Sequence, residues 1–95
     1  MDIQNRILNE FDMQNANEAT KKDFLKNASK ALMNLIKEKY ADILAKQDQE
    51  ELAKVMDGSE DEIIAYLDKI VPDVQIVVDE AFEELKKIYS YVQSF

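Results

Sequence analysis

The sequence predicts an all-α fold, a compact four- or five-helix bundle with short loops, in a single domain of 95 residues. The chain is 46% hydrophobic and 34% charged, which is too apolar for a disordered protein. It contains one glycine and one proline, too few turn-forming residues for a protein of many strands. Its apolar residues also recur at the three- and four-residue spacing of helices.

Residues 1–13 are predicted to form a short amphipathic helix with Asp2 as its cap. The apolar residues of this segment fall on one helical stripe: Ile3, Ile7, Leu8 and Phe11. Residues 14–19 are polar and lack a stripe, so we expect a linker there. Such a helix can complete the core of its own chain or swap onto a second copy, and we expect core completion.

Residues 20–95 are expected to form the bundle. Thr20, followed by Asp23, is close to a capping box, so the longest helix of the first half should start at Thr20. One face of this helix is apolar for about six turns: Phe24, Leu25, Ala28, Leu32, Leu35, Ile36, Ile43 and Leu44. Mostly lysines occupy the other face: Lys22, Lys26, Lys30, Lys37 and Asp42.

The turns of the second half are marked by single residues. Asp48 is placed to begin a short helix, residues 49–57, and Gly58 stands where a helix end favours a left-handed residue. Residues 59–62 form a capping box for the next helix. That helix should end near Val71, because Pro72 has no amide proton and suits the first turn of the last helix.

The last helix carries a heptad-like apolar stripe with alternating steps of four and three residues. Its members are Val74, Val78, Ala81, Leu85, Ile88, Val92 and Phe95. Such a stripe can pack within its own core or against a second protomer. A homodimer through the C-terminal helix is therefore one expected arrangement.

The net charge of −8 is concentrated in the second half of the chain. Residues 1–47 hold eight Lys/Arg and seven Asp/Glu, a net of +1, whereas residues 48–95 hold four Lys and thirteen Asp/Glu, a net of −9. Such a field repels nucleic acid and anionic membranes. We expect a protein partner with a basic surface, no direct nucleic-acid binding and no membrane contact. Without a signal sequence or a run of about 18 apolar residues, a cytoplasmic location is expected.

The usual side chains of catalysis are missing. The chain contains no histidine and no cysteine, which excludes histidine acid–base chemistry and thiol nucleophiles. Its one glycine excludes a glycine-rich phosphate loop. Residues 57–62 superficially resemble a calcium loop, but Glu62 stands where that loop needs glycine. We therefore expect no enzyme activity, no metal and no cofactor.

Six residues of the last helix are candidates for an interaction: Asp79, Glu80, Glu83, Glu84, Tyr91 and Phe95. The four carboxylates form either the solvated face of this helix or an acidic patch, which could merge with other acidic residues nearby. The two rings lie where the end of a long helix often extends past the core, so a partner could hold them. Core packing is the alternative for both rings.

Two functions fit this sequence. The first is a non-enzymatic protein–protein interaction module. The alternative is an acidic inhibitor or nucleic-acid mimic, whose carboxylates would block a basic groove on a partner protein. A carboxylate enzyme with a bound metal is a third, weaker hypothesis.

Residues 44–95 resemble a family of small helical bacterial proteins, a domain of unknown function. Four short features and the acidic closing helix carry the resemblance: the helix with Glu50-Glu51-Leu52, the break at Asp57-Gly58, the segment 62–67 and the corner 70–73. The resemblance covers about half of the chain. It implies a helical bacterial protein, and the family offers no activity or site residues to transfer.

Overall fold

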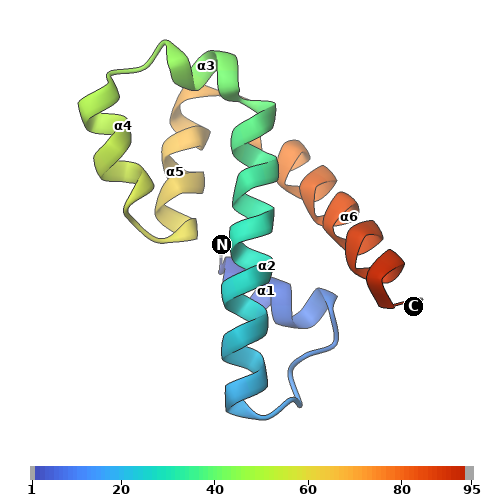
Figure 1. The fold of residues 1–95 in the computed structure, drawn as a ribbon. Helices are drawn as coiled ribbons and strands as arrows, with labels where there is room; N and C mark the ends of the chain where they lie inside the picture. The colour runs from blue at the N-terminus through green and yellow to red at the C-terminus, as the bar shows by residue number, and fades with distance from the viewer. Residues whose placement is uncertain (1, 94–95) are drawn as a thin grey trace.

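The computed structural model describes the backbone of residues 2–93 and the side chains of residues 2–89. About 80% of the described residues are helical, and this part of the chain contains no strand. Its six helices, shown in Figure 1, are α1 (Ile3–Glu10), α2 (Glu18–Lys39), α3 (Ala41–Ala45), α4 (Gln49–Met56), α5 (Glu60–Ile70) and α6 (Val74–Gln93). Five of them have seven or more residues, so the predicted all-α helical bundle is confirmed.

The long helix α2 is the centre of the fold (Figure 1). Helices α1 and α6 both pack against α2, and α6 also contacts α5. Helices α4 and α5 form a hairpin on the flank of α2 opposite α6. The short α3 connects the end of α2 to this hairpin. The molecule thus has two flanks beside α2, one with the α4–α5 hairpin and one with α6.

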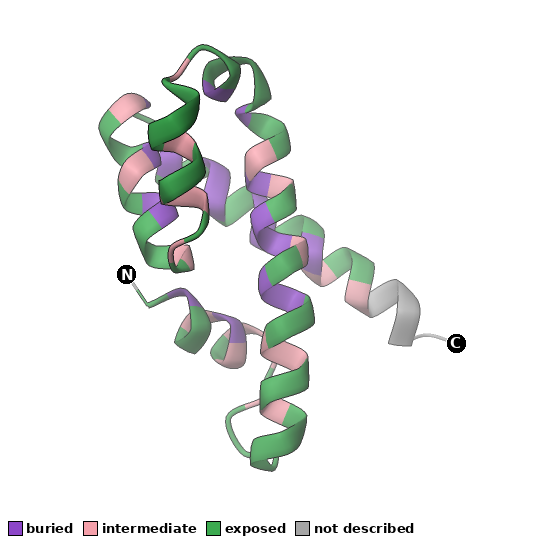
Figure 2. Cartoon of the chain, turned by 60° about the vertical axis from the view of Figure 1, so that its left-hand side comes forward, coloured by how far each residue is buried: buried purple, intermediate pink, exposed green. Residues whose placement is uncertain are grey.

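The core lies where α1, α2, α5 and α6 meet (Figure 2). Its largest fully buried side chains come from all four helices: Ile3, Ile7, Leu32, Ile36, Leu67, Val74, Val78, Phe82 and Leu85. Complete burial of one such aliphatic side chain stabilises the fold by about 1.5–3 kcal/mol. The predicted apolar stripes of α2 and α6 therefore supply most of the core.

Helix α1 completes the core of its own chain in this structure. Ile3 and Ile7 are fully buried, and the Asp2 side chain accepts a hydrogen bond of 3.1 Å from the Asn5 amide. The helix ends at Glu10, three residues before the predicted end, because Asp12 adopts a left-handed conformation with φ 55°. Aspartate is among the few residues that tolerate this conformation.

Three aromatic rings meet where α1 leaves the core. The rings of Phe11, Phe24 and Tyr89 have centroids 5.4 Å apart in every pair. Phe11 meets each of the other two edge to face, an arrangement that aromatic pairs favour. The predicted packing of Phe24 against the core is confirmed, and Tyr89 packs there as well, with both rings half-buried.

The start of α2 differs from the prediction. The helix begins at Glu18, and its cap is Asn17, whose side chain accepts a hydrogen bond of 2.8 Å from the Thr20 amide. The prediction of a start at Thr20 was wrong because asparagine is at least as good a cap as threonine. Glu18 in the first turn also interacts favourably with the helix dipole.

The end of α2 also differs from the prediction. The helix stops at Lys39 instead of continuing through Leu44, and Tyr40 leaves helical geometry with φ −109° and ψ 17°. The Tyr40 side chain is buried, and its hydroxyl donates a hydrogen bond of 2.9 Å to Asp73. After this break Leu44 is buried and Ile43 is 36% exposed, so the predicted single stripe is divided.

The caps of the α4–α5 hairpin agree with the prediction in part. Asp48 accepts hydrogen bonds from the amides of Glu50 and Glu51, and Ser59 accepts one of 3.3 Å from the amide of Glu62. The prediction of a left-handed Gly58 was wrong, because its φ is not positive. A Cβ at this position would meet the end of the flexible Glu62 side chain, which can turn away, and would lie 3.2 Å from the Val55 carbonyl oxygen, so the available space favours glycine only weakly.

Helix α5 ends at Ile70, and Val71 is extended before Pro72, as predicted. Pro72 lies in a turn before α6 rather than in its first helical turn. The apolar stripe of α6 is buried as far as Leu85, and Ile88 is 50% exposed. The Val92 side chain and Phe95 lie outside the described residues.

Candidate interaction surface

The four predicted acidic residues share the outer face of α6. Asp79, Glu80, Glu83 and Glu84 stand at helical positions that lie side by side, because residues three and four apart are neighbours on a helix. Their side chains are 47–68% exposed. The structure therefore brings the four carboxylates together on one solvent-facing surface.

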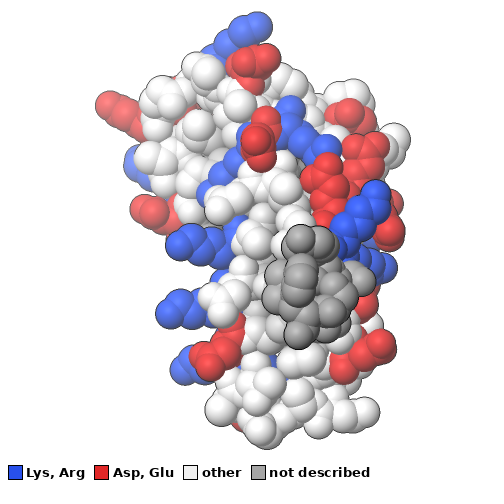
Figure 3. Space-filling model, turned by 45° about the vertical axis from the view of Figure 1, so that its right-hand side comes forward, with Lys and Arg blue, Asp and Glu red and all other residues white. Residues whose placement is uncertain are grey.

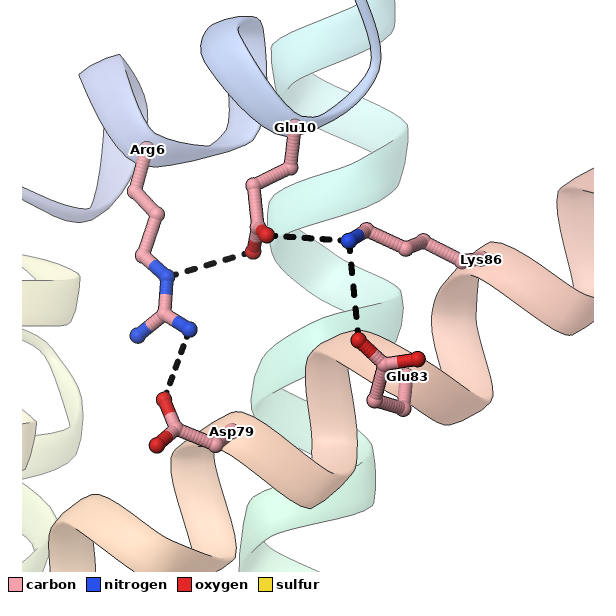
Figure 4. Close-up of polar contacts among 5 residues, drawn as sticks. All are labelled: Arg6, Glu10, Asp79, Glu83 and Lys86. Carbon is pink, nitrogen blue, oxygen red and sulfur yellow. Dashed lines mark hydrogen bonds and ion pairs between the residues drawn. The ribbon is translucent and has the colours of Figure 1, made fainter.

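Asp79 is paired with an arginine from α1 (Figure 4). Arg6 Nη2 lies 2.6 Å from Asp79 Oδ1, and Arg6 Nε lies 3.2 Å from Glu10 Oε2. The guanidinium carbon also lies 4.2 Å from the centroid of the Phe82 ring, a cation–π distance. Arg6 is therefore fixed by three neighbours, two of them on α6.

Glu83 belongs to the same network through a lysine. Lys86 Nζ lies 2.9 Å from Glu10 Oε1 and 3.5 Å from Glu83 Oε1, so charges of alternating sign link α1 to α6 (Figure 4). The hydrogen bond to Glu10 is the main cause that raises the pKa of Lys86 above its ordinary value. This contact therefore favours the charged form of Lys86.

Glu80 and Glu84 share a cation from the end of α2. Lys39 Nζ lies 3.8 Å from Glu80 and 3.7 Å from Glu84. Each of the four predicted carboxylates thus lies within 4 Å of a cationic nitrogen. Exposed pairs of this kind contribute only about 0–1 kcal/mol each to stability, but they make the surface one of mixed charge. Figure 3 shows acidic and basic side chains intermingled on the right of the molecule.

A shallow hollow of about 640 Å³ lies among these charges. Its described lining consists of Arg6, Lys39, Ile76, Asp79, Glu80, Glu83, Glu84 and Lys87. Ile76 is the one hydrophobic side chain in this lining, and it is 61% exposed. The hollow therefore combines an exposed apolar side chain with a charged rim, in which every described residue except Lys87 forms an ion pair.

The sequence interpretation missed Ile76, Arg6 and Lys39. Ile76 lies off the apolar stripe of α6, on an otherwise polar face. An isoleucine in such a position indicates an exposed apolar residue, and it could have been found from the sequence. The positions of Arg6 and Lys39 depend on how α1 and α2 pack on α6, which no local pattern gives.

The other two candidates lie outside the described residues. The Tyr91 side chain and the whole of Phe95 are not among the positions that the structure describes. Their predicted role stays a prediction. Ile88 of α6 is half exposed.

Several other acidic residues of the second half form hydrogen bonds with residues of the first half. Asp61 accepts a hydrogen bond of 3.1 Å from the Ile3 amide, and Glu60 accepts one from the Ser29 hydroxyl. Asp73 accepts a hydrogen bond from the Tyr40 hydroxyl. These three carboxylates tie α5 and the turn before α6 to α1, α2 and the residue that ends α2.

The described part of the chain contains neither a helix suited to cross a membrane nor a cluster of metal ligands. Within residues 2–93, no helix combines the length and the apolar character that a membrane crossing requires. No group of three acidic side chains in this range is arranged to hold a metal ion.

Comparison of the chain with protein-family models, with curated proteins and with solved structures gives no match. The resemblance of residues 44–95 to a bacterial family therefore stays a prediction. The function has to be argued from the surface itself.

Proposed function

We propose that the chain is a non-enzymatic protein-interaction module that binds a partner through the hollow around Ile76. The observation that carries this proposal is an isoleucine, 61% exposed, in a hollow whose other described lining residues are all charged. Protein interfaces have this anatomy, with an apolar centre that is buried on binding and a polar rim that excludes water. The absence of histidine and cysteine supports a role in binding rather than catalysis.

Ile76 and the rim would act in different ways. Covering the exposed part of Ile76 would contribute about 1–2 kcal/mol, and an apolar side chain of the partner would fill the hollow. Glu80, Glu83 and Glu84 keep exposed oxygen atoms that can meet basic groups of the partner. Such rim charges raise the association rate and select the partner more than they raise affinity.

The mixed charge of the rim favours this function over nucleic-acid mimicry. A mimic needs carboxylates that present their charge freely to a basic groove. Here the four α6 carboxylates already lie beside Arg6, Lys39 and Lys86. A partner with one apolar anchor and a few basic groups fits the surface better than a groove built to hold phosphates.

A second copy of the chain is one candidate partner. Ile76 is exposed on α6, so a two-fold arrangement of two copies could bury the Ile76 of both copies in one interface. Sedimentation of the purified chain distinguishes this homodimer from a complex with a different protein.

Site-specific crosslinking in the cells of origin tests the proposal. A photoreactive amino acid at position 76 should give one predominant crosslinked protein, because the side chain there would be buried by the partner. The same amino acid at Ala53, an exposed residue of α4, is the matched control. Crosslinking no stronger at position 76 than at position 53 would contradict the proposal.

Charge reversal then tests the rim. The double variant Glu83→Lys/Glu84→Lys should weaken the crosslinked complex about tenfold, with a smaller effect at high salt. The double variant Glu50→Lys/Glu51→Lys changes the same charge on α4 and should have little effect. A partner that is released by added DNA would instead support the nucleic-acid mimic.

A further inference from the structure

A second groove lies on the other flank of α2, between α2 and the α4–α5 hairpin. Its volume is about 540 Å³. Four apolar side chains line it, two from α2 and two from the hairpin: Leu25, Met33, Met56 and Ile63. None of the residues around the hollow at Ile76 contributes to this groove.

A row of lysines borders the groove. Lys22, Lys26, Lys30 and Lys37 all line it, and their steps of four, four and seven residues place them on one side of α2. From Lys22 to Lys37 the row extends over about 22 Å of helix axis. It is therefore a linear array of positive charge beside an apolar surface.

These lysines are available for a ligand. Among the described residues, none of the four has a carboxylate oxygen within 4.0 Å of its ammonium nitrogen. Two lysines of the α6 flank differ, because Lys39 and Lys86 each contact two carboxylates, whereas Lys87 on that flank has no such contact among the described residues. Glu60 is the one acidic residue in the described lining, and it accepts a hydrogen bond from Ser29.

We propose that this groove binds an acidic amphipathic helix of a partner protein. A helix laid along α2 would place Glu or Asp side chains, spaced by four residues, opposite the lysine row. Its apolar face would meet Leu25 and Met56, the two apolar lining residues that are only half-buried, whereas Met33 and Ile63 belong to the core. A methionine side chain adapts readily to such a contact. About 15 residues of helix match the length of the row.

A nucleic acid fits this groove less well. Phosphates could pair with the lysine row, but a phosphate backbone leaves the apolar wall uncovered. The net charge of −8 also opposes the approach of a long polyanion. Nucleic acid is therefore an alternative outcome of the test rather than the proposed ligand.

This site is independent of the proposed function at Ile76. It calls for a partner whose charge is opposite to the one that the sequence predicts. The sequence predicts a partner with a basic surface, whereas the groove selects an acidic one. With both sites occupied, α2 would lie between two different partners.

A fluorescent peptide tests the inference on the full chain. The probe is an amphipathic helix of about 16 residues with Glu on one face and Leu on the other, read by fluorescence anisotropy. We expect saturable binding with a Kd of about 10 µM or tighter. A control peptide with every Glu replaced by Gln should bind about tenfold more weakly.

Paired variants locate the binding site. Lys26→Glu/Lys30→Glu should weaken the probe about tenfold or more. The matched control Lys54→Glu/Lys69→Glu reverses two exposed lysines outside the groove and should leave binding unchanged. Met56→Gln should also weaken binding, whereas Ile76→Glu should not. Circular dichroism confirms that each variant is folded.

Three results would overturn the inference. They are the absence of saturable binding, equal binding of the Gln peptide, and equal effects of the two lysine pairs. Displacement of the probe by a single-stranded oligothymidine, with loss of that competition in Lys26→Glu/Lys30→Glu, would assign the groove to nucleic acid instead.

Discussion

At the scale of single residues, the buried Tyr40 connects two parts of the fold. Its hydroxyl donates to Asp73 over 2.9 Å, which joins the end of α2 to the turn before α6. Burial is the main cause that raises the pKa of Tyr40 to about 12, and the hydrogen bond and the negative charges of Asp73 and Glu80 add to it. The folded protein therefore holds this proton more tightly than the unfolded chain does.

This difference predicts a loss of stability at alkaline pH. An unfolded tyrosine loses its proton near pH 10, whereas Tyr40 in the folded protein keeps it up to about pH 12. The contribution of the neutral hydroxyl is complete below pH 10 and is lost as the pH rises toward 12. Tyr40→Phe should lower the free energy of unfolding by about 1 kcal/mol at neutral pH and flatten this dependence.

Urea denaturation at several pH values measures both effects. Tyr66→Phe is the control, because the structure gives the Tyr66 hydroxyl no hydrogen bond within the described residues. An equal alkaline slope in the Tyr40→Phe variant would contradict the assignment to Tyr40.

Cap residues show which residue-scale features a sequence can predict. Asp48 and Ser59 were predictable because an N-cap depends on its own side chain and on amides two or three residues away. Which of Asn17 and Thr20 caps α2 was not predictable. Both are good caps, and the choice between them depends on the path of the chain before the helix. Gly58 was misinterpreted because a glycine after a helix suggests positive φ in a sequence, whereas this one does not adopt it.

At the scale of elements, α1 is held to the molecule by two kinds of contact. Ile3 and Ile7 are fully buried in the core, while Arg6 and Glu10 form exposed or half-buried ion pairs with α6. Apolar burial should outweigh the ion pairs, because surface pairs lose most of their energy to solvation.

Two substitutions in α1 compare these contributions. Ile7→Ala should lower the free energy of unfolding by about 3 kcal/mol, since it leaves a cavity in the core. Glu10→Gln weakens the contacts with both Arg6 and Lys86 and should cost less than about 1 kcal/mol. Chemical denaturation of the two variants measures the difference, and equal losses would show that the ion pairs dominate.

The elements were predictable where their stripe is continuous. The continuous stripe of α6 predicted that helix, the capping box at residues 59–62 predicted the start of α5, and Pro72 marked the turn between them. The break at Tyr40 was not predictable, because the apolar spacing continues through it. The break coincides with the hydrogen bond from Tyr40 to Asp73, thirty-three residues further along the chain.

At the scale of the whole molecule, most helices pack against neighbours in the chain, while α2 and α6 meet across three intervening helices. Small helical proteins with mostly local contacts fold within microseconds to milliseconds. We expect refolding in a single phase of about 10 ms or less, measured by stopped-flow circular dichroism. A dominant phase lasting seconds would contradict this expectation.

The candidate sites were predictable only in part. The acidic cluster on α6 and the lysine face of α2 are visible as helical spacings in the sequence. Their surroundings are not, because Arg6 and Lys39 reach α6 only through the packing of α1 and α2. In the same way, Met56 and Ile63 join the lysine row only when the hairpin folds against α2.

The ring cluster of Phe11, Phe24 and Tyr89 gives the molecule an optical signal of its own. The chain has no tryptophan, so its near-ultraviolet circular dichroism arises from tyrosine and phenylalanine. Rings held 5.4 Å apart in a fixed asymmetric arrangement contribute to this spectrum, and rings that lose their packing do not. Because Phe11 directly follows α1, detachment of α1 would be seen without any label.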